Sequence, residues 1–545
     1  MDYNYKYDTE MDAINSHYLY GINWDFELAK LEVKRLENTG EPQKKFVART
    51  LNEFTDSPTF ETMRIAEQYL MNENVTISNR ERPALGVAGT VSQHPLLANT
   101  KLKHPFMYNL VEQKVNFLLS REMSIESSNR DYATKISEYF DKSFHRQLKT
   151  LGQSAVPFGI AWLQVYYNSS GELKFKHIPS HEVIPFWRDS EHRELDAVIR
   201  YYVVNVYNDE GIPREVTKIE YYTDEGVWYY EKDENGISVD PKHSVYPQPN
   251  FFVNVEDTEL KQVQDTDEEI EEFPTMWSKI PFVAFKYNHY EVSLLQWVRS
   301  LIDEYDQITS ELSNNIKDFP NSFKVVKGYS GEDEDAFNVR LATSRTAFLT
   351  SDEGSDMKVL TMPLDYEGVR TVSERLRKDI YDGGKGLDPQ EANFGHASGV
   401  AIRYRYLGLV QDCMAMGNEF QEALEKLLYF INIDIRMKGG EDYSKERVDF
   451  IFNTDAIMNE TETITNIRNS VGILSDETLV AMHPYTTDAQ AEFERLKLQR
   501  EEQMKQFGTD DPLGTGNREF GSDMTAEAFL EAESKGTGLD IKKRG

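Results

Sequence analysis

Two glycine-rich stretches contain residue types that could do chemistry. Gly383-Gly384-Lys385-Gly386 has the glycine and lysine of a phosphate-binding loop, but such a loop needs four residues between its glycines and a Ser or Thr after the lysine. Gly395-His396-Ala397-Ser398-Gly399 nearly offers the turn that presents a nucleophilic serine. Ser398 is the fourth of the five residues, however, and no strand-like run precedes it. We therefore predict neither nucleotide binding nor a serine nucleophile here.

Metal-ligating residues do not form a recognisable pattern either. The eleven histidines are scattered, and His396 has no evident metal partner. The single cysteine, Cys413, excludes an internal disulfide and a Cys-rich zinc site, and we expect it to be a small buried residue. The acids at 265–269 suggest a calcium loop, but Ile270 stands where an EF-hand requires glycine. The sequence thus predicts no enzyme activity, no metal and no cofactor.

The composition limits the partners of the chain. Ninety-three acidic and sixty basic residues give 545 residues a net charge of -33, which argues against a surface that grips nucleic acid. With 39% hydrophobic residues, we expect a folded protein with two or more packed regions. The N-terminus lacks the pattern of a signal peptide, and no apolar run is long enough to span a membrane. We expect a protein that is soluble and intracellular at synthesis, without a membrane partner.

Both glycine-rich stretches lie in a connector between two predicted helices. Residues 364–383 have an amphipathic helical period that ends at Gly383-Gly384. Residues 384–397 have no period, and their glycines predict a mobile loop. A long helix follows to about residue 436, which at ~1.5 Å per residue spans roughly 55 Å. Its predicted apolar stripe comprises Val400, Tyr404, Leu407, Val410, Met414, Leu424, Leu428, Ile431 and Ile435.

An earlier helix, residues 293–319, carries apolar residues at alternating steps of three and four, and acids including Asp303 and Asp306 on its other face. One short partner helix cannot cover this apolar stripe, so we expect neighbouring copies to cover it. The intervening residues 320–363 are strand-like and rich in turns, which predicts a helical hairpin with a small β-rich tip. The predicted oligomer interface comprises Leu294, Val298, Leu301, Tyr305, Ile308, Leu312, Leu376 and Ile380.

The other segments predict helices around an antiparallel meander. Helical patterns occupy residues 57–72, 106–119 and 131–151, and the period changes to two at Gly159. Residues 254–273 form an acidic run that self-repulsion should keep solvated. Beyond the long helix we expect a strand at 448–452, helices at 460–471 and 487–507, and a short helix capped by Ser475. The predicted fold class is α+β, mainly α-helical.

Three stretches of the chain resemble phage portal proteins of the SPP1-like family. The first is Asn393-Phe394-Gly395-His396-Ala397-Ser398-Gly399-Val400-Ala401, followed by the long helix. The second runs from Tyr290 through Leu301-Ile302-Asp303-Glu304-Tyr305, Ser310 and Asn314 to Val325-Val326-Lys327-Gly328. The third is Val471-Gly472-Ile473-Leu474-Ser475-Asp476-Glu477-Thr478, followed by Pro484. The resemblance covers roughly residues 90–500.

This resemblance implies an architecture. An N-terminal helical and loop segment at 1–100 would precede a wing at 101–292, which includes the acidic loop 254–273. Stem helices at 293–319 and 364–383 would flank a clip at 320–363, and a tunnel loop would follow at 384–397. The remaining parts would be a long bracing wing helix and strand at 398–453, a helical crown at 454–507 and a largely disordered tail at 508–545.

The resemblance also implies a function, namely a twelve-fold ring at one capsid vertex through which double-stranded DNA passes without sequence specificity during packaging and ejection. The implied partners are the terminase large subunit, a head-completion adaptor, scaffold protein and major capsid protein; the location is the virion, or the host cytoplasm during assembly. Twelve copies would carry about 400 negative charges, so most of the channel would repel phosphates. Residues predicted to line the channel are Gly384, Lys385, Gly386, Asn393, Phe394, His396, Arg403 and Arg405.

Other interpretations of the sequence remain open. Arg403 and Arg405 could equally be solvated or paired between subunits. A non-enzymatic acidic scaffold of prophage or cellular origin could oligomerise through the same hairpin without conducting DNA. A nucleic-acid-processing ATPase would need the phosphate loop that the sequence lacks.

Overall fold

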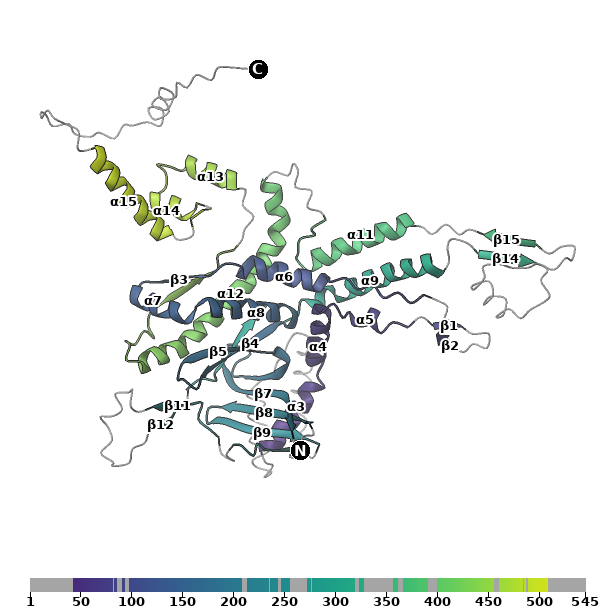
Figure 1. Ribbon diagram of the computed structural model, residues 1–545, viewed down its shortest axis with the longest axis horizontal. Coiled ribbons are helices and arrows are strands. Elements are labelled where there is room, and N and C mark those ends of the chain that lie inside the picture. The colour runs from purple at the N-terminus through teal and green to yellow at the C-terminus, as the bar shows by residue number, and fades with distance from the viewer. Residues whose placement is uncertain are drawn as a thin grey trace, which may run out of the picture. The chain divides into compact units, whose positions relative to one another are not determined.

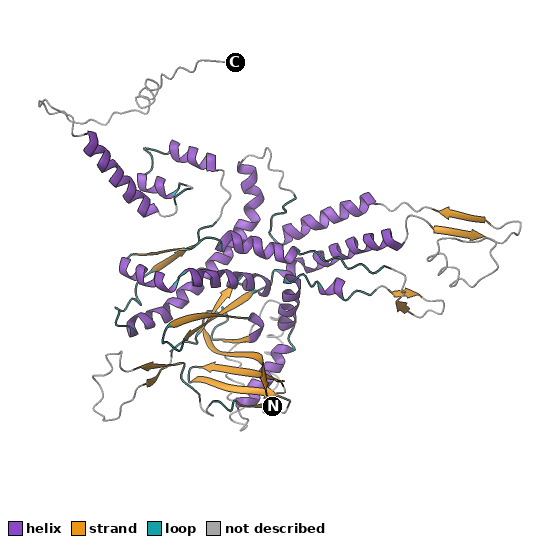
Figure 2. Cartoon of the chain, in the orientation of Figure 1, coloured by secondary structure: helices purple, strands orange, loops and turns teal. Residues whose placement is uncertain are grey.

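The computed structural model describes residues 43–81, 83–85, 91–93, 98–207, 213–234, 236–243, 247–254, 272–275, 277–318, 323–327, 356–360, 366–390, 399–454, 460–483, 485–486 and 489–507. They belong to two compact units, Met1–Ile457 and Met458–Gly545. Helices make up about half of the described residues and the strands pair antiparallel, so the predicted α+β class is confirmed (Figures 1 and 2).

The predicted meander is divided between two antiparallel sheets, the larger of which has five strands. Its order is β10-β9-β8-β7-β6, formed by Gly236–Val239, Gly226–Asp233, Pro213–Thr223, Leu195–Tyr207 and Val183–Trp187. A three-stranded sheet, β13-β4-β5, combines Phe282–Lys286 with Ile160–Tyr167 and Leu173–Ile178, which follow the change of period at Gly159. Two-stranded pairs are β1 (Pro83–Leu85) with β2 (Val91–Gln93), β11 (Phe251–Asn254) with β12 (Glu272–Thr275), β14 (Phe323–Lys327) with β15 (Asp356–Leu360), and β3 (Ser124–Ser127) with β16 (Val448–Ile451).

Strand β4 separates two apolar cores because its side chains alternate between its faces. Ile160 and Trp162 belong to the core that contains the five-stranded sheet and α3 (Gln43–Thr55). Ala161 and Leu163 face the other core, which contains α6 (Phe106–Leu119), α8 (Lys142–Phe158) and α12 (Gly399–Met437). Further helices are α4 (Pro58–Leu70), α5 (Val75–Ser78) and α7 (Arg130–Tyr139).

The prediction of one helix over 131–151 was wrong, because the chain forms α7 and α8 separately. Asp141 lies between them with an extended backbone, and its Oδ1 accepts a hydrogen bond of 2.8 Å from the Phe144 amide. An aspartate in this position caps a new helix and so interrupts the old one.

Two helices form the predicted hairpin. Helix α9 (Leu295–Asp318) lies beside α11 (Tyr366–Gly383), and the strands β14 and β15 follow and precede them along the chain (Figure 1). The predicted boundaries of both helices are confirmed to within two residues. Other residues of the predicted β-rich tip, and most of the acidic run at 254–273, lie outside the described residues.

The polar face of α9 is covered by an extended segment, residues 98–104, which we call the strap. The amides of Thr100, Leu102 and His104 donate hydrogen bonds of 2.7, 2.9 and 3.1 Å to Asn314, Ser310 and Asp306. These three side chains of α9 are fully buried. Four residues of helix rise about 6 Å, and two residues of extended chain rise about 6.6 Å, so alternate strap amides match successive helix turns. Asp306 is therefore an internal hydrogen-bond acceptor.

Helix α12 contains 39 residues and confirms the predicted long helix. Leu424, Ile431 and Ile435 are buried as expected from the stripe. In its N-terminal half the predicted face was wrong: Tyr404 is 74% exposed and Met414 is 62% exposed. This half carries apolar residues on two faces, and α6 and β13 pack against the one that contains Leu409, Cys413, Met416 and Phe420.

The described residues of the second unit form α13 (Glu460–Asn469), α14 (Asp476–Ala481) and α15 (Ala489–Phe507). Ser475 caps α14 as predicted, because its hydroxyl accepts a hydrogen bond of 3.3 Å from the Thr478 amide. Arg500 of α15 forms an ion pair of 3.0 Å with Asp476.

Candidate functional site

The connector after α11 begins with an ordered helix C-terminus. The Gly386 amide donates to the Tyr381 carbonyl at 2.8 Å, and the Lys385 amide donates to the Asp382 carbonyl at 3.1 Å. This pair of bonds is a Schellman motif, whose left-handed residue is usually glycine. Here Lys385 takes that conformation, with φ of 48°, although glycines stand on both sides of it. The predicted end of the helix at Gly383-Gly384 is confirmed, since α11 ends at Gly383.

The glycines at 384 and 386 allow α6 to approach closely. A Cβ on Gly384 would lie 2.6 Å from Leu110 Cδ1, and a Cβ on Gly386 would lie 2.3 Å from Leu110 Cδ2. Neither glycine has a positive φ, and the close approach of Leu110 gives both a packing role that differs from the mobility we expected. In residues 384–390 the glycines serve packing.

This contact predicts a contrast between neighbouring glycines. Gly386→Ala should destabilise the protein by about 1–3 kcal/mol, because overpacking forces buried neighbours such as Leu110 to move. Gly383→Ala should be neutral or slightly stabilising, since a Cβ there meets nothing closer than 3.8 Å. Thermal unfolding of both variants measures the difference. Equal melting temperatures would contradict the assigned role of Gly386.

Side chains from α6 and α11 hold the next residues of the connector. Gln113 makes two hydrogen bonds of 2.8 Å with the backbone of Leu387, donating to its carbonyl and accepting from its amide. The Arg377 guanidinium pairs with both oxygens of Asp388, at 2.8 and 2.7 Å. Burial opposes the charge of Asp388, but Arg377 and the Gln390 amide still hold the pKa of that carboxyl below its ordinary value. Residues 384–390 are thus tied to both helices.

A buried ion cluster links the connector to α12. Asp412 of α12 accepts from Lys114 at 2.6 Å, from Lys385 at 3.0 Å and from the Tyr287 hydroxyl at 2.5 Å. Lys114 also donates to the Lys385 carbonyl at 3.3 Å. The Lys114 side chain is fully buried and the Asp412 side chain is 11% exposed. Although burial raises it, the pKa of Asp412 is lowered overall by these two ammonium groups and by the tyrosine hydroxyl.

Only some of the predicted channel residues are described. Gly384, Lys385 and Gly386 lie in the ordered start of the connector, and the Lys385 ammonium is engaged with Asp412. Asn393, Phe394 and His396 lie outside the described residues, as does the side chain of Arg403. Arg405 is exposed on α12.

The predicted interface residues divide into two groups. Leu294, Val298 and Ile380 are buried in the core of their own unit, so they have no surface to offer a neighbouring copy. This differs from our expectation, because α6 and α8 lie against the base of the hairpin. The partly buried members are Leu301, Tyr305, Ile308, Leu312 and Leu376.

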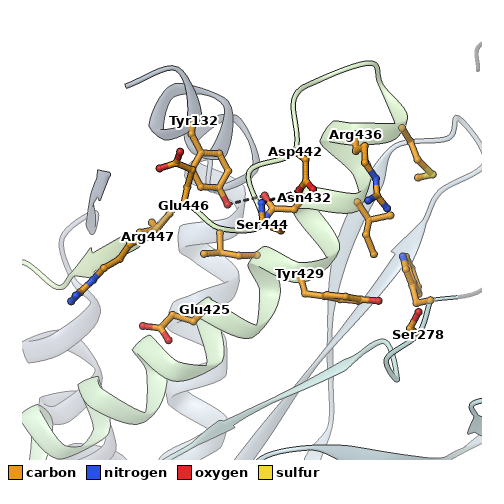
Figure 3. Close-up of a pocket in the computed structure, with 15 residues that line it drawn as sticks. Tyr132, Ser278, Glu425, Tyr429, Asn432, Arg436, Asp442, Ser444, Glu446 and Arg447 are labelled. Carbon is orange, nitrogen blue, oxygen red and sulfur yellow. Dashed lines mark hydrogen bonds between the residues drawn. The ribbon is translucent and has the colours of Figure 1, made fainter. Parts of the chain in front are cut away.

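A groove of about 910 Å³ lies along the C-terminal half of α12 (Figure 3). Its sides carry Glu425, Arg436, Asp442 and Glu446, and the Tyr132 hydroxyl donates to Asn432 at 2.7 Å. The side chains that line it include no histidine or cysteine, and the charges are mixed in sign. The carboxylate of Asp442 accepts a hydrogen bond of 3.0 Å from the Ser444 amide within this lining.

The described part of the chain lacks two further features. It contains no cluster of three His, Cys, Asp or Glu side chains that could hold a metal ion. None of its helices combines the length and apolar character needed to cross a bilayer.

Sequence reasoning missed the residues that hold the connector, namely Arg377, Asp388, Gln113, Lys114 and Asp412. Lys114 gave one signal, because it lies among the apolar residues of α6 at a position that its helical period buries. A lysine there requires an anionic partner, but the sequence does not say which of many acids supplies it.

Comparisons of the sequence with known proteins identify relatives of this chain. The sequence model of the family described as "Phage portal protein, SPP1 Gp6-like" matches residues 59–506. The chain is 26% identical over 487 residues to the portal protein of Bacillus phage SPP1, which covers 88% of this chain and 90% of that protein. It is 26% identical over 460 residues to the portal protein of Clostridium phage phiCD119, covering 80% and 91% respectively. Because the family match spans well over half of the sequence, the chain belongs to the SPP1 Gp6-like family of phage portal proteins.

Proposed function

We propose that this portal protein forms a twelve-subunit ring at one capsid vertex and conducts double-stranded DNA during packaging and ejection. The observation that carries the proposal is the family match over residues 59–506, which includes the α9–α11 hairpin, the connector and α12. Portal proteins are structural components rather than enzymes, so the chain would guide DNA without catalysing a reaction.

Within such a ring we assign α9 and α11 to the stem and β14–β15 to the clip. The α12 helix would brace the wing, together with the five-stranded sheet, and the second unit would form the crown. The covering of α9 supports this assignment: the strap occupies its polar face, and α11 lies on another. A neighbouring copy of the chain would cover the rest of the apolar stripe of α9.

The subunit contacts proposed here start from the partly buried residues Leu301, Tyr305, Ile308, Leu312 and Leu376. Ile316 of α9 and Val372 of α11 add exposed apolar surface to the same hairpin. Tyr404, Leu407 and Met414 add a second apolar face on α12. A closed ring needs two different faces on each subunit, and exposed apolar surface on separate elements meets that requirement.

We place the connector in the channel, where residues 391–397 would approach the DNA and Arg405 would lie near them. The net charge of -33 favours weak contact with phosphates and no sequence preference. Lys385→Glu is not a clean test of this contact, because the new carboxylate would lie close to Asp412.

The partners proposed for the assembled ring are the terminase large subunit and then a head-completion adaptor at the clip. Scaffold protein and major capsid protein would meet its outer surface. The location would be the portal vertex of the virion, with the host cytoplasm as the place of assembly.

The ring itself is the first expected result. Purified protein at micromolar concentration and moderate salt should appear as closed rings with a central hole in negative-stain images. Native mass spectrometry should give a mass near that of twelve chains. A strictly monomeric species would contradict the proposal. Rings that enter procapsids but never admit DNA would instead favour the acidic scaffold.

A further inference from the structure

We propose that Asp388 and Asp412 are positioning residues that fix where the connector leaves α11 and how far the end of α11 lies from α12. The inference rests on the proposed function for its consequence in DNA passage. The anchor itself, which we define as residues 384–390 with Gln113, Lys114, Arg377 and Asp412, is argued from described contacts alone.

The first half of the anchor is the pair Arg377–Asp388. A planar guanidinium that meets both carboxylate oxygens fixes orientation as well as distance. The Arg377 guanidinium also lies over the rings of Phe106 and Tyr381, at 5.9 and 5.5 Å from their centres. Asp388 in turn accepts from the Gln390 amide at 2.9 Å. The ion pair therefore determines the direction of the backbone as far as residue 390.

The second half of the anchor joins the end of α11 directly to α12. Lys385 lies just after α11, Asp412 lies in α12, and their side chains meet at 3.0 Å. Lys114 of α6 contacts both the Asp412 carboxylate and the Lys385 carbonyl. The end of α11 is thus held against α12 and α6 by contacts among described residues on either side of 391–398. The contacts of the anchor therefore position the end of α11 relative to α12.

The experiment measures hydrogen exchange of the peptide that covers residues 384–390 in assembled rings without DNA. Arg377→Gln and Asp388→Asn each remove charge-assisted hydrogen bonds, so amides in this peptide should exchange about tenfold faster than in the wild type. Arg377→Lys keeps the positive charge but loses the bidentate geometry, so it should recover part of the protection of residues 384–390 against hydrogen exchange.

Arg375→Gln is the matched control. Arg375 lies on the same helix and pairs with Asp379 at 2.9 Å, but its side chain is largely exposed and contacts no residue of the anchor. This control should leave exchange at 384–390 unchanged. Unchanged exchange in both Arg377→Gln and Asp388→Asn would overturn the anchor. So would acceleration spread evenly over the chain, since that indicates global destabilisation.

DNA packaging by the same variants tests the consequence separately. If the connector lines the channel, Arg377→Gln should lower the amount of packaged DNA and Arg375→Gln should not. Faster exchange at 384–390 with normal packaging would support the anchor and contradict the channel position of the connector. Slow exchange with poor packaging would overturn the anchor and leave the channel position standing.

Discussion

Replacing Asp412 by alanine should lower the free energy of unfolding by about 3–5 kcal/mol, the usual cost of removing one partner of a buried ion pair. The Lys114 ammonium is fully buried, and Asp412 is the one carboxylate that the described contacts place beside it. The variant also leaves the Tyr287 hydroxyl without its acceptor. Thermal unfolding of the ring and of any dissociated subunit measures the loss.

Asp449→Ala serves as the control for Asp412→Ala. Asp449 pairs with Arg447 at 3.0 Å, but both side chains are exposed, so the control should lose no more than about 1 kcal/mol. Combining Asp412→Leu with Lys114→Met should recover much of the lost stability, because apolar residues of similar size can replace a buried ion pair. If Asp412→Ala unfolds at the same temperature as the control, the cluster does not stabilise the subunit.

Deleting Asn393, Phe394, Gly395 and His396 should leave ring assembly and procapsid incorporation intact while removing most DNA packaging. Assembly should survive because the Lys385–Asp412 pair and the Gln113–Leu387 bonds lie outside the deletion. Packaging should fall because the proposed DNA contacts lie within it. The measurement is the amount of nuclease-protected DNA in purified procapsids.

A variant of constant length completes this test. Replacing the same four residues by alanine or glycine removes their side chains but preserves the reach of the chain, so it separates length from chemistry. Normal packaging by the deletion variant would place the connector away from DNA. Failure of the deletion variant to form rings would make the segment a subunit contact instead.

Periodicity was sufficient to predict the helices that have one apolar face. The hairpin α9–α11, the length of α12 and the capping of α14 by Ser475 all follow from patterns within single segments. Strands β7, β8 and β9 of the meander were equally clear, because a period of two followed by turn residues leaves few alternatives. The break between α7 and α8 could also be predicted from the sequence, since aspartate is a favoured N-cap residue and Asp141 caps α8.

Contacts between segments far apart in sequence could not be predicted in the same way. Asp306 looks like any solvated acid of an amphipathic helix until residues 98–104 are known to lie against it. The glycines at 384 and 386 looked like hinges because the sequence does not reveal the approach of Leu110. Choosing one of the two apolar faces of α12 likewise required knowing where α6 and β13 pack.

The strap on α9 restricts how that helix can move. The strap amides that donate to α9 alternate along the strap, and their acceptors lie four residues apart on the helix. A slip of one residue in either segment would therefore break all three bonds at once and leave buried acceptors without donors. The next register that restores any of the bonds lies four helix residues away, about 6 Å along the axis. The strap and α9 therefore have one favoured register. Small displacements of α9 require the two segments to bend or rotate together.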